Sequence, residues 1–379
     1  MSAENRRIVP NSAEPAISKY LNSKGCALGL PISGNFELTA RCNFNCKMCY
    51  VHLNNTEQLK KKELKADQWL SIASDARDQG MVFLLLTGGE PFLREDFEEI
   101  YRELIKMGIL ISINSNASLY DGDIRKLLKA YPPSRINVTL YGGSEETYAN
   151  LCGNPSYNKV VQNLKYMKED NLQVRLNVSL TPDNVHDMEL IHQISQEIGL
   201  HAKTTSYMYP DVRVTGETGV NAGRFDPVVA GEVKARWNYL RDEKNQFFGR
   251  VSNVLKCRGN GCQEETLNNE QDGVMCRAGR SSFWLTWDGK MLPCGTMDFE
   301  PAYPMETGFK KAWDDIKSRV KEIKLPVACT SCNLKNFCGV CAANCKAETG
   351  AFDIKPQYLC DMANAYCDKI VDLSQMLQK

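Results

Sequence analysis

Segments patterned as strands alternate with segments patterned as helices from residue 36 to about residue 206. Short, largely apolar runs typical of strands lie at 36–40, 81–87, 109–114, 135–141, 173–180 and 201–207. Amphipathic stretches typical of helices lie between them, at 66–80, 95–108, 156–170 and 184–199, and several end in glycine. Strands separated by helices in this way predict βα units and a parallel sheet. We therefore predict an α/β fold whose main part, residues 36–207, is a partial (β/α)6 barrel of the TIM type.

After residue 207 the alternation of strand and helix patterns ends. Residues 209–227 are rich in glycine and turn formers and predict a connecting or lid segment, and residues 228–244 have a helical pattern. The sequence SFWLTWDGKMLPC predicts a β-hairpin with its turn at Asp288 and Gly289. We divide the chain into an N-terminal extension (1–35), the barrel (36–207), a linking segment with a helix (208–256) and a small cysteine-rich module with a hairpin, short helices and a C-terminal helix (257–379).

Charge and hydropathy exclude several classes of function. The 379 residues contain 46 Lys and Arg against 46 Asp and Glu, so nothing draws the chain towards nucleic acid or an anionic membrane. The polar N-terminus lacks the apolar core of a secretory signal, and the longest apolar run, residues 81–86, is too short to span a bilayer. We expect a soluble cytoplasmic protein with no nucleic-acid or membrane partner.

Sixteen cysteines then require an explanation, because the cytosol keeps thiols reduced. Eleven of them lie between Cys257 and Cys367, and three more lie between Cys42 and Cys49. Clusters of reduced cysteines at short spacing indicate metal ligation rather than disulfides.

Three polar loops follow the first three predicted strands. The loop with Cys42, Cys46 and Cys49 follows the first strand, TGGEP (87–91) the second and NSN (114–116) the third. Because chemistry in parallel βα folds lies at the carboxyl ends of the strands, we expect the three loops to form one site.

The spacing of the first loop is C-x3-C-x2-C. Iron–sulfur cubanes are held by thiolates and normally take four, so three leave one iron open to a small molecule. A zinc site is the alternative, with His52 as the one local candidate for a fourth ligand.

This loop, with GGEP about 40 residues later, resembles the radical S-adenosylmethionine (radical SAM) superfamily. The resemblance implies that Cys42, Cys46 and Cys49 hold a [4Fe–4S] cluster whose open iron binds S-adenosylmethionine. Reductive cleavage of that cofactor would give a 5′-deoxyadenosyl radical that abstracts hydrogen from the substrate. The implied cofactor contacts are Gly88 and Gly89 (close backbone approach), Glu90 (acceptor for the ammonium), Pro91 (fixing the turn), Asn114, Asn116 and Thr139 (polar contacts) and Met48 (adenine). Ordinary capping of strand ends is the alternative for Asn114, Asn116 and Thr139.

The cysteine-rich module resembles the SPASM extension of radical SAM enzymes, which carries two auxiliary iron–sulfur clusters, here expected to be [4Fe–4S]. By spacing, the outer cluster would take Cys329, Cys332, Cys338 and Cys360. The inner cluster would take Cys276, Cys294 and Cys341, Cys345 or both, with Cys257 or Cys262 as the fourth ligand or an open iron in its place. A zinc ribbon is the alternative for this module. We interpret Cys26, Cys152 and Cys367 as packing residues.

SPASM-type enzymes mostly modify peptides and proteins, so the resemblance implies a radical oxidoreductase that matures a ribosomally made peptide or protein. The barrel mouth would hold the target residue, the auxiliary clusters would accept the second electron, and a flavodoxin- or ferredoxin-type protein would supply the first. Only 41 residues precede Cys42, so we expect any leader peptide to need a separate binding protein or the groove between the two modules. Asp298 is a candidate base, with a solvated loop carboxylate as the alternative. The alternative functions are radical chemistry on a small molecule such as a tetrapyrrole or an alcohol, oxidation of Ser or Cys as in sulfatase maturation, and metal binding without catalysis.

Overall fold

The computed structural model describes residues 14–51, 53, 57–260 and 273–376. Six parallel strands form the main sheet, in the order in which they occur along the chain. They are β1 (Ser33–Glu37), β2 (Phe83–Thr87), β3 (Leu110–Ser115), β4 (Arg135–Thr139), β5 (Val174–Ser179) and β6 (Ala202–Thr205). The predicted α/β fold with a parallel sheet of the partial-barrel type is confirmed.

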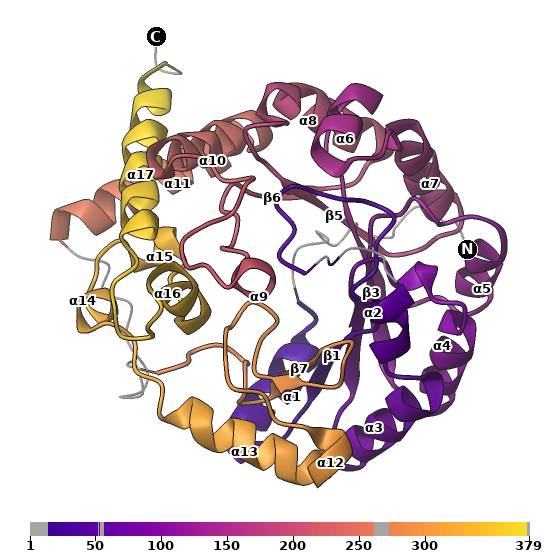
Figure 1. The fold of residues 1–379 in the computed structure, drawn as a ribbon. Helices are drawn as coiled ribbons and strands as arrows, with labels where there is room; N and C mark the ends of the chain where they lie inside the picture. The colour runs from indigo at the N-terminus through magenta and orange to yellow at the C-terminus, as the bar shows by residue number, and fades with distance from the viewer. Residues whose placement is uncertain (1–13, 52, 54–56, 261–272, 377–379) are drawn as a thin grey trace, which may run out of the picture.

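Helices cover the outer face of this sheet in an arc (Figure 1). They are α3 (Ala66–Asp78), α4 (Phe97–Lys106), α5 (Gly122–Ala130), α6 (Glu145–Cys152), α7 (Tyr157–Glu169) and α8 (Met188–Ile198). The short helix α2 (Glu57–Lys62) lies inside this arc, beside β3 in the view of Figure 1, and the 3-10 turns are η1 (Pro91–Leu93) and η2 (Val185–Asp187). The helices α2, α5 and α6 were not among the predicted segments. The sequences of α2 and α6 are short and mostly polar and show little of the amphipathic pattern that identifies α3, α4, α7 and α8. α5 has such a pattern, with Leu127 and Leu128 buried, but it extends over only nine residues.

The strands alternate between apolar residues that face the helices and polar residues that face the barrel interior. In β4, Ile136 and Val138 are fully buried, while Asn137 and Thr139 between them line the interior cavity. This alternation follows from the two-residue period of a strand. The polar inner face leaves the barrel mouth able to accommodate a ligand.

The predicted hairpin forms, and it extends the barrel sheet. Its strands β7 (Ser282–Leu285) and β8 (Met291–Leu292) pair antiparallel, with Gly289 in the left-handed region at the turn (φ 87°). β7 also pairs in parallel with β1, Ser33 opposite Ser282, so the sheet order is β6-β5-β4-β3-β2-β1-β7-β8. The cysteine-rich part therefore shares a sheet with the barrel.

The first strand begins earlier than predicted, at Ser33 rather than residue 36. Residues Ser33 to Phe36 have partners on both sides, β2 and β7, and Glu37 pairs with β2. Thr39 and Ala40 leave the ladder and lead into the three-cysteine loop.

The remaining helices continue the ring beyond α8, and α12 and α13 lead it back to α3 (Figure 1). They are α9 (Val212–Thr215), α10 (Pro227–Arg241), α11 (Lys244–Asn260), α12 (Pro304–Thr307), α13 (Phe309–Lys321), α14 (Val327–Thr330), α15 (Lys335–Cys338), α16 (Ala342–Thr349) and α17 (Gln357–Met376). α1 (Ala16–Leu28), within the predicted N-terminal extension, lies against the start of β7, where the Cys26 thiol is 3.2 Å from the Ser281 hydroxyl. Among the described residues no helix is both long enough and apolar enough to cross a bilayer.

Candidate active site

A cavity of about 350 Å³ lies at the carboxyl ends of the parallel strands. The three-cysteine loop forms one wall, and the loops after β2 and β3 form the next. The structure thus brings together most of the predicted site, namely Cys42, Cys46, Cys49, Met48, Gly88, Gly89, Asn114, Asn116 and Thr139.

The glycine pair lets the loop after β2 pack directly on the cysteine loop. A Cβ on Gly88 would lie 2.3 Å from the carbonyl oxygen of Thr39, and one on Gly89 would lie 2.2 Å from that of Arg41. The two backbones are hydrogen-bonded, Gly89 N–H to the Thr39 carbonyl (2.7 Å) and Glu90 N–H to the Arg41 carbonyl (2.9 Å). The close approach that we expected towards a ligand is thus also an approach between two loops of the protein.

Glu90 lies behind the cavity wall rather than in it. Its carboxylate is fully buried and accepts hydrogen bonds from Ser115 Oγ (3.0 Å), Asn116 N–H (2.8 Å) and Phe92 N–H (3.2 Å). Burial raises the pKa of this carboxyl to about 7, and the hydrogen bonds oppose the rise. Glu90 therefore joins the loop after β2 to the loop after β3, and Pro91 begins the 3-10 turn η1 beside it.

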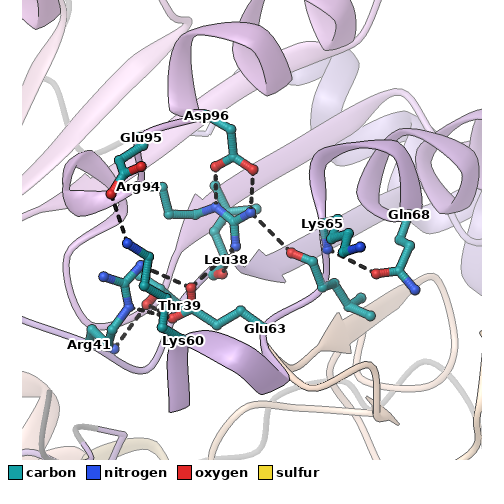
Figure 2. Close-up of polar contacts among 11 residues, drawn as sticks. Leu38, Thr39, Arg41, Lys60, Glu63, Lys65, Gln68, Arg94, Glu95 and Asp96 are labelled. Carbon is teal, nitrogen blue, oxygen red and sulfur yellow. Dashed lines mark hydrogen bonds and ion pairs between the residues drawn. The ribbon is translucent and has the colours of Figure 1, made fainter. Parts of the chain in front are cut away.

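A buried ionic network fixes the start of the cysteine loop (Figure 2). The Glu63 carboxylate accepts two hydrogen bonds from the guanidinium of Arg41, the residue before Cys42, at 2.8 and 2.9 Å, and a third from the Thr39 hydroxyl. Arg94 lies 3.7 Å from Glu63 and donates to the carbonyls of Leu38 (2.8 Å) and Leu64 (3.0 Å). The network therefore ties the end of β1 to the segment between α2 and α3.

Burial disfavours the charged form of two of the three thiols, those of Cys42 and Cys46. Burial raises the pKa of Cys42 to about 12, and the hydrogen bond between the Cys46 and Cys152 thiols, together with burial, raises that of Cys46. Neutral thiols are thus favoured without metal, and iron would supply the positive charge that stabilises thiolates here. His52, the alternative zinc ligand, lies outside the described residues.

Several polar side chains of the cavity were missed by the sequence reasoning. Asn137 donates to Asn114 Oδ1 (2.8 Å), and its own Oδ1 is buried without a hydrogen-bond partner. Such an acceptor fits a bound ligand that donates from an N–H or O–H group. Asn177 and Ser179 on β5 and Thr205 on β6 extend the same polar face. The available signal was their alternation with apolar residues along the predicted strands.

Aromatic residues close the cavity on the side of the C-terminal part. Tyr207, Tyr209 and Trp284 line it, and the rings of Tyr50 and Tyr209 lie 6.2 Å apart. The Tyr207 hydroxyl donates to Glu348 of α16 (2.6 Å), which also pairs with Arg224 (2.8 Å). These contacts join the barrel mouth to the cysteine-rich part.

The segment predicted to connect or to form a lid packs on the cysteine loop. Asn221 donates to the Met48 carbonyl (3.0 Å), and a Cβ on Gly223 would lie 2.4 Å from that of Met48. Arg213 pairs with the buried Glu37 of β1 (3.0 Å) and donates to the Gly295 carbonyl (2.9 Å).

The four cysteines expected to form the outer set line one cavity of about 140 Å³. Cys329, Cys332, Cys338 and Cys360 all line it. A compact space between four thiols fits a four-thiolate cluster. Within the described residues, no three His, Cys, Asp or Glu side chains converge on a single metal ion.

Of the two alternatives for the inner set, Cys341 is the one that interacts with Cys294 and Cys276. Burial, followed by the nearby thiols of Cys294 and Cys276, raises the pKa of Cys341 to about 11. Cys345 is fully buried in α16 and interacts with Cys329 and Cys341, which places it between the two sets.

The other candidates lie elsewhere. Cys257 is buried on α11, where its neighbour Arg258 pairs with Asp368 of α17 (2.7 Å). Cys262 lies outside the described residues. Asp298, the candidate base, is exposed and lines a different surface hollow with Arg319 and Lys346. The structure does not bring Asp298 to the cavity, because the chain after Cys294 turns away from the barrel mouth.

Comparison with known proteins agrees with this geometry. The family model of the radical SAM superfamily matches residues 36–194. The AdoMet-dependent heme synthase of Methanosarcina barkeri is 23% identical over 332 residues, which cover 84% of this chain and 93% of that protein. A probable GTP 3′,8-cyclase of Metallosphaera sedula is 31% identical over 264 residues, which cover 68% of this chain and 78% of that protein.

Two solved structures share the fold. SuiB of Streptococcus suis, bound to its precursor peptide SuiA, has a TM-score of 0.65 at 16% identity and covers 94% of this chain and 83% of its own. The structure of anSMEcpe with bound AdoMet has a TM-score of 0.63 at 14% identity and covers 92% of this chain and 100% of its own. The match to the cyclase extends well beyond the cysteine loop, and together with the family model it shows that this chain belongs to the radical SAM superfamily.

Proposed function

We propose that this radical SAM enzyme abstracts hydrogen from a side chain of a peptide or protein and that two auxiliary iron–sulfur clusters of the SPASM type assist the oxidation. The observation that carries the proposal is the convergence of three thiols, the glycine loop and a polar strand-end surface on one cavity. The cluster and S-adenosylmethionine would together supply a radical that abstracts hydrogen.

The residues of the chain would bind and orient this pair. Cys42, Cys46 and Cys49 would hold the cluster, and Met48 would contact the adenine. The amino group of the cofactor would meet the backbone of Gly88 and Gly89, because the Glu90 carboxylate is engaged behind them. Asn137 and Asn116 would provide polar contacts, and the aromatic wall would limit access of water.

The chemistry of the cavity favours a peptide as the substrate. Among the described residues that line it there is no Lys, Arg, His, Asp or Glu, and amide, hydroxyl and aromatic groups predominate. Such a surface suits peptide backbone and uncharged side chains, whereas carboxylate- or phosphate-rich substrates would be expected to need Lys or Arg. The relation of the fold to SuiB, whose structure contains a precursor peptide, supports the same choice.

A tetrapyrrole is the second candidate. The heme synthase of M. barkeri aligns with this chain over nearly its whole length, and this favours the second candidate. A tetrapyrrole would have to place its carboxylates outside the neutral cavity.

Further parts of the proposal concern partners and location. A flavodoxin- or ferredoxin-type protein would reduce the cluster, a separate protein would bind any leader peptide, and the enzyme would act in the cytoplasm. Asp298 stays a hypothesis as the base, although its exposed position away from the cavity does not support it.

The first experiment tests the radical chemistry anaerobically. We expect the reconstituted protein to bind about twelve iron atoms, roughly four for each proposed cluster. With dithionite and S-adenosylmethionine it should form 5′-deoxyadenosine. The triple variant Cys42→Ala, Cys46→Ala, Cys49→Ala should form none while it keeps about two-thirds of the iron. Undiminished cleavage in that variant, or stoichiometric zinc in the wild type, would overturn the proposal.

The second experiment distinguishes the two substrate classes. A deuterated precursor peptide encoded beside the gene and a deuterated carboxylated iron porphyrin are supplied in turn. Deuterium that enters 5′-deoxyadenosine from the peptide supports the maturase, and deuterium from the porphyrin supports the second candidate.

A further inference from the structure

A second hollow, on the flank of the hairpin, brings together cysteines from opposite ends of the sequence. It has a volume of about 720 Å³, and Cys276 and Cys294, two of the expected inner-cluster ligands, line it. Cys26 of α1 lines the same hollow. We propose that Cys26 is the fourth ligand of the inner auxiliary cluster, together with Cys276, Cys294 and Cys341. This inference rests on the proposed function, because it assumes that the inner set binds iron and sulfide.

Contacts of α1 and the residues just before it hold the helix against the segment that follows Cys276. Glu14 forms an ion pair with Arg277 (2.6 Å). Asn22, which is 1% exposed, accepts hydrogen bonds from Ser33 Oγ (2.9 Å) and Ser281 Oγ (3.3 Å). The Cys26 thiol donates to the same Ser281 hydroxyl (3.2 Å). The contacts with Arg277 and Ser281 keep α1 next to the segment that follows Cys276, and the contact with Ser33 joins α1 to β1.

The approach of the helix is as close as its sequence permits. A Cβ on Gly25 would lie 2.3 Å from Ile32 Cγ1 and 3.0 Å from Ser281 Cβ, so the absence of a side chain there lets α1 pack on this segment. Cys26, the next residue, is thereby held at the rim of the hollow.

The expected inner cluster lacks a fourth thiolate ligand, and Cys26 can provide it. A cubane cluster normally takes four thiolates, and Cys276, Cys294 and Cys341 supply three. Cys26 is half-buried and reaches the hollow, whereas Cys152 and Cys367, the other cysteines interpreted as packing residues, are fully buried in the core. Cys257 lies on α11 beside α17. Cys26 thus differs from a packing cysteine in both exposure and surroundings.

The test uses the full-length chain with Cys42, Cys46 and Cys49 replaced by alanine, so that only the auxiliary sets can bind iron. After anaerobic reconstitution and reduction, electron paramagnetic resonance spectra are recorded with and without cyanide, which binds iron that lacks a thiolate ligand. We expect this background to show no response to cyanide. Adding Cys26→Ala should create a cyanide-dependent signal or remove about four iron atoms per chain.

Two further variants on α1 separate ligation from packing. Cys26→Ser keeps the size of the side chain and should shift the signal of one cluster while the iron content holds. Ser23→Ala, which changes another residue that lines the hollow, should match the background. A Cys26→Ser spectrum identical to the background would contradict ligation even if Cys26→Ala fails to fold.

The inference would be overturned by a cyanide response already present in the background, by a Cys26→Ser spectrum identical to the background, or by the expected change in Cys262→Ala instead. Absence of an inner-cluster signal in the background would also overturn it. Formation of 5′-deoxyadenosine by the wild type is measured separately, so failure of this inference is distinguishable from failure of the proposed function.

Discussion

Gly89 sets the distance between two loops of the active site. Because an added Cβ would lie 2.2 Å from the Arg41 carbonyl oxygen, Gly89→Ala must push the glycine loop away from the cysteine loop. We expect binding of S-adenosylmethionine to weaken at least about tenfold, or by roughly 1.4 kcal/mol, as measured by equilibrium titration of the anaerobic protein. Gly249→Ala is the control, because nothing lies within 4 Å of its added Cβ and helix α11 should gain up to about 1 kcal/mol. Equal affinity in Gly89→Ala and wild type would contradict this account.

Glu90 should make the metal-free fold sensitive to pH. Its carboxyl pKa rises from an ordinary 4.5 to about 7 in the folded chain, so the folded state binds the proton more tightly than the unfolded state. The free energy of unfolding should therefore fall as pH rises from about 4.5 to about 7, by roughly 3 kcal/mol from this group. Urea unfolding at several pH values measures this change. In Glu90→Gln this contribution to the fall in the free energy of unfolding should be absent. If the free energy of unfolding depends on pH in the same way in wild type and Glu90→Gln, the raised pKa of Glu90 is contradicted.

At the residue scale, the motif cysteines and glycines could be predicted because their spacing is local in the sequence. The position of Glu90 could not be predicted, because the motif does not show that Ser115 and Asn116 hydrogen-bond its carboxylate. Asp298 was chosen for its proximity to Cys294 in sequence, and that proximity does not determine which way a loop turns.

The loop after β1 depends on Glu63, a residue that no motif identified. Glu63→Ala would leave the guanidinium of Arg41 buried without its main partner, and loss of one member of a buried pair costs about 3–5 kcal/mol. We expect such a loss in the free energy of unfolding, together with weaker iron retention by the cysteine loop. Chemical denaturation and iron analysis of the variant would measure the two effects.

An exposed ion pair provides the matched control for Glu63. Glu98→Ala removes the partner of Arg102 on the surface of α4, where both side chains contact solvent. It should cost less than about 1 kcal/mol. A similar cost for both substitutions would show that the network does not hold the loop.

At the element scale, all six barrel strands and the hairpin were predictable from hydrophobic period and turn residues. The boundary of β1 was not, because its start is determined by its pairing with β7, about 250 residues later. Helix α1 was also missed, since its main contacts are with residues 277–281 and not with its neighbours in sequence.

The shared sheet and core predict that the whole molecule unfolds in one step. Phe283 of β7 is fully buried and packs against Phe36 of β1 and Phe309 and Trp313 of α13. Phe283→Ala should therefore destabilise the barrel and the cysteine-rich part together, by about 3–5 kcal/mol. Far-UV circular dichroism and tryptophan fluorescence should report coincident urea transitions in both proteins.

Val327→Ala is the control for this prediction, since Val327 is 84% exposed and its loss should change stability by less than about 0.5 kcal/mol. Two separate transitions, with only one shifted by Phe283→Ala, would show that the division at residue 257 marks an independent unit.

Trp284 forms a partition between the two hollows, since its indole lines both and donates to Glu37 (2.8 Å). The Trp284 indole is itself a fluorophore. Its fluorescence should change when a cluster or cofactor binds in either hollow. The difference in emission between wild type and Trp284→Phe separates this signal from that of the other four tryptophans. The protein thereby contains its own optical probe of cofactor loading, readable under anaerobic conditions without a label.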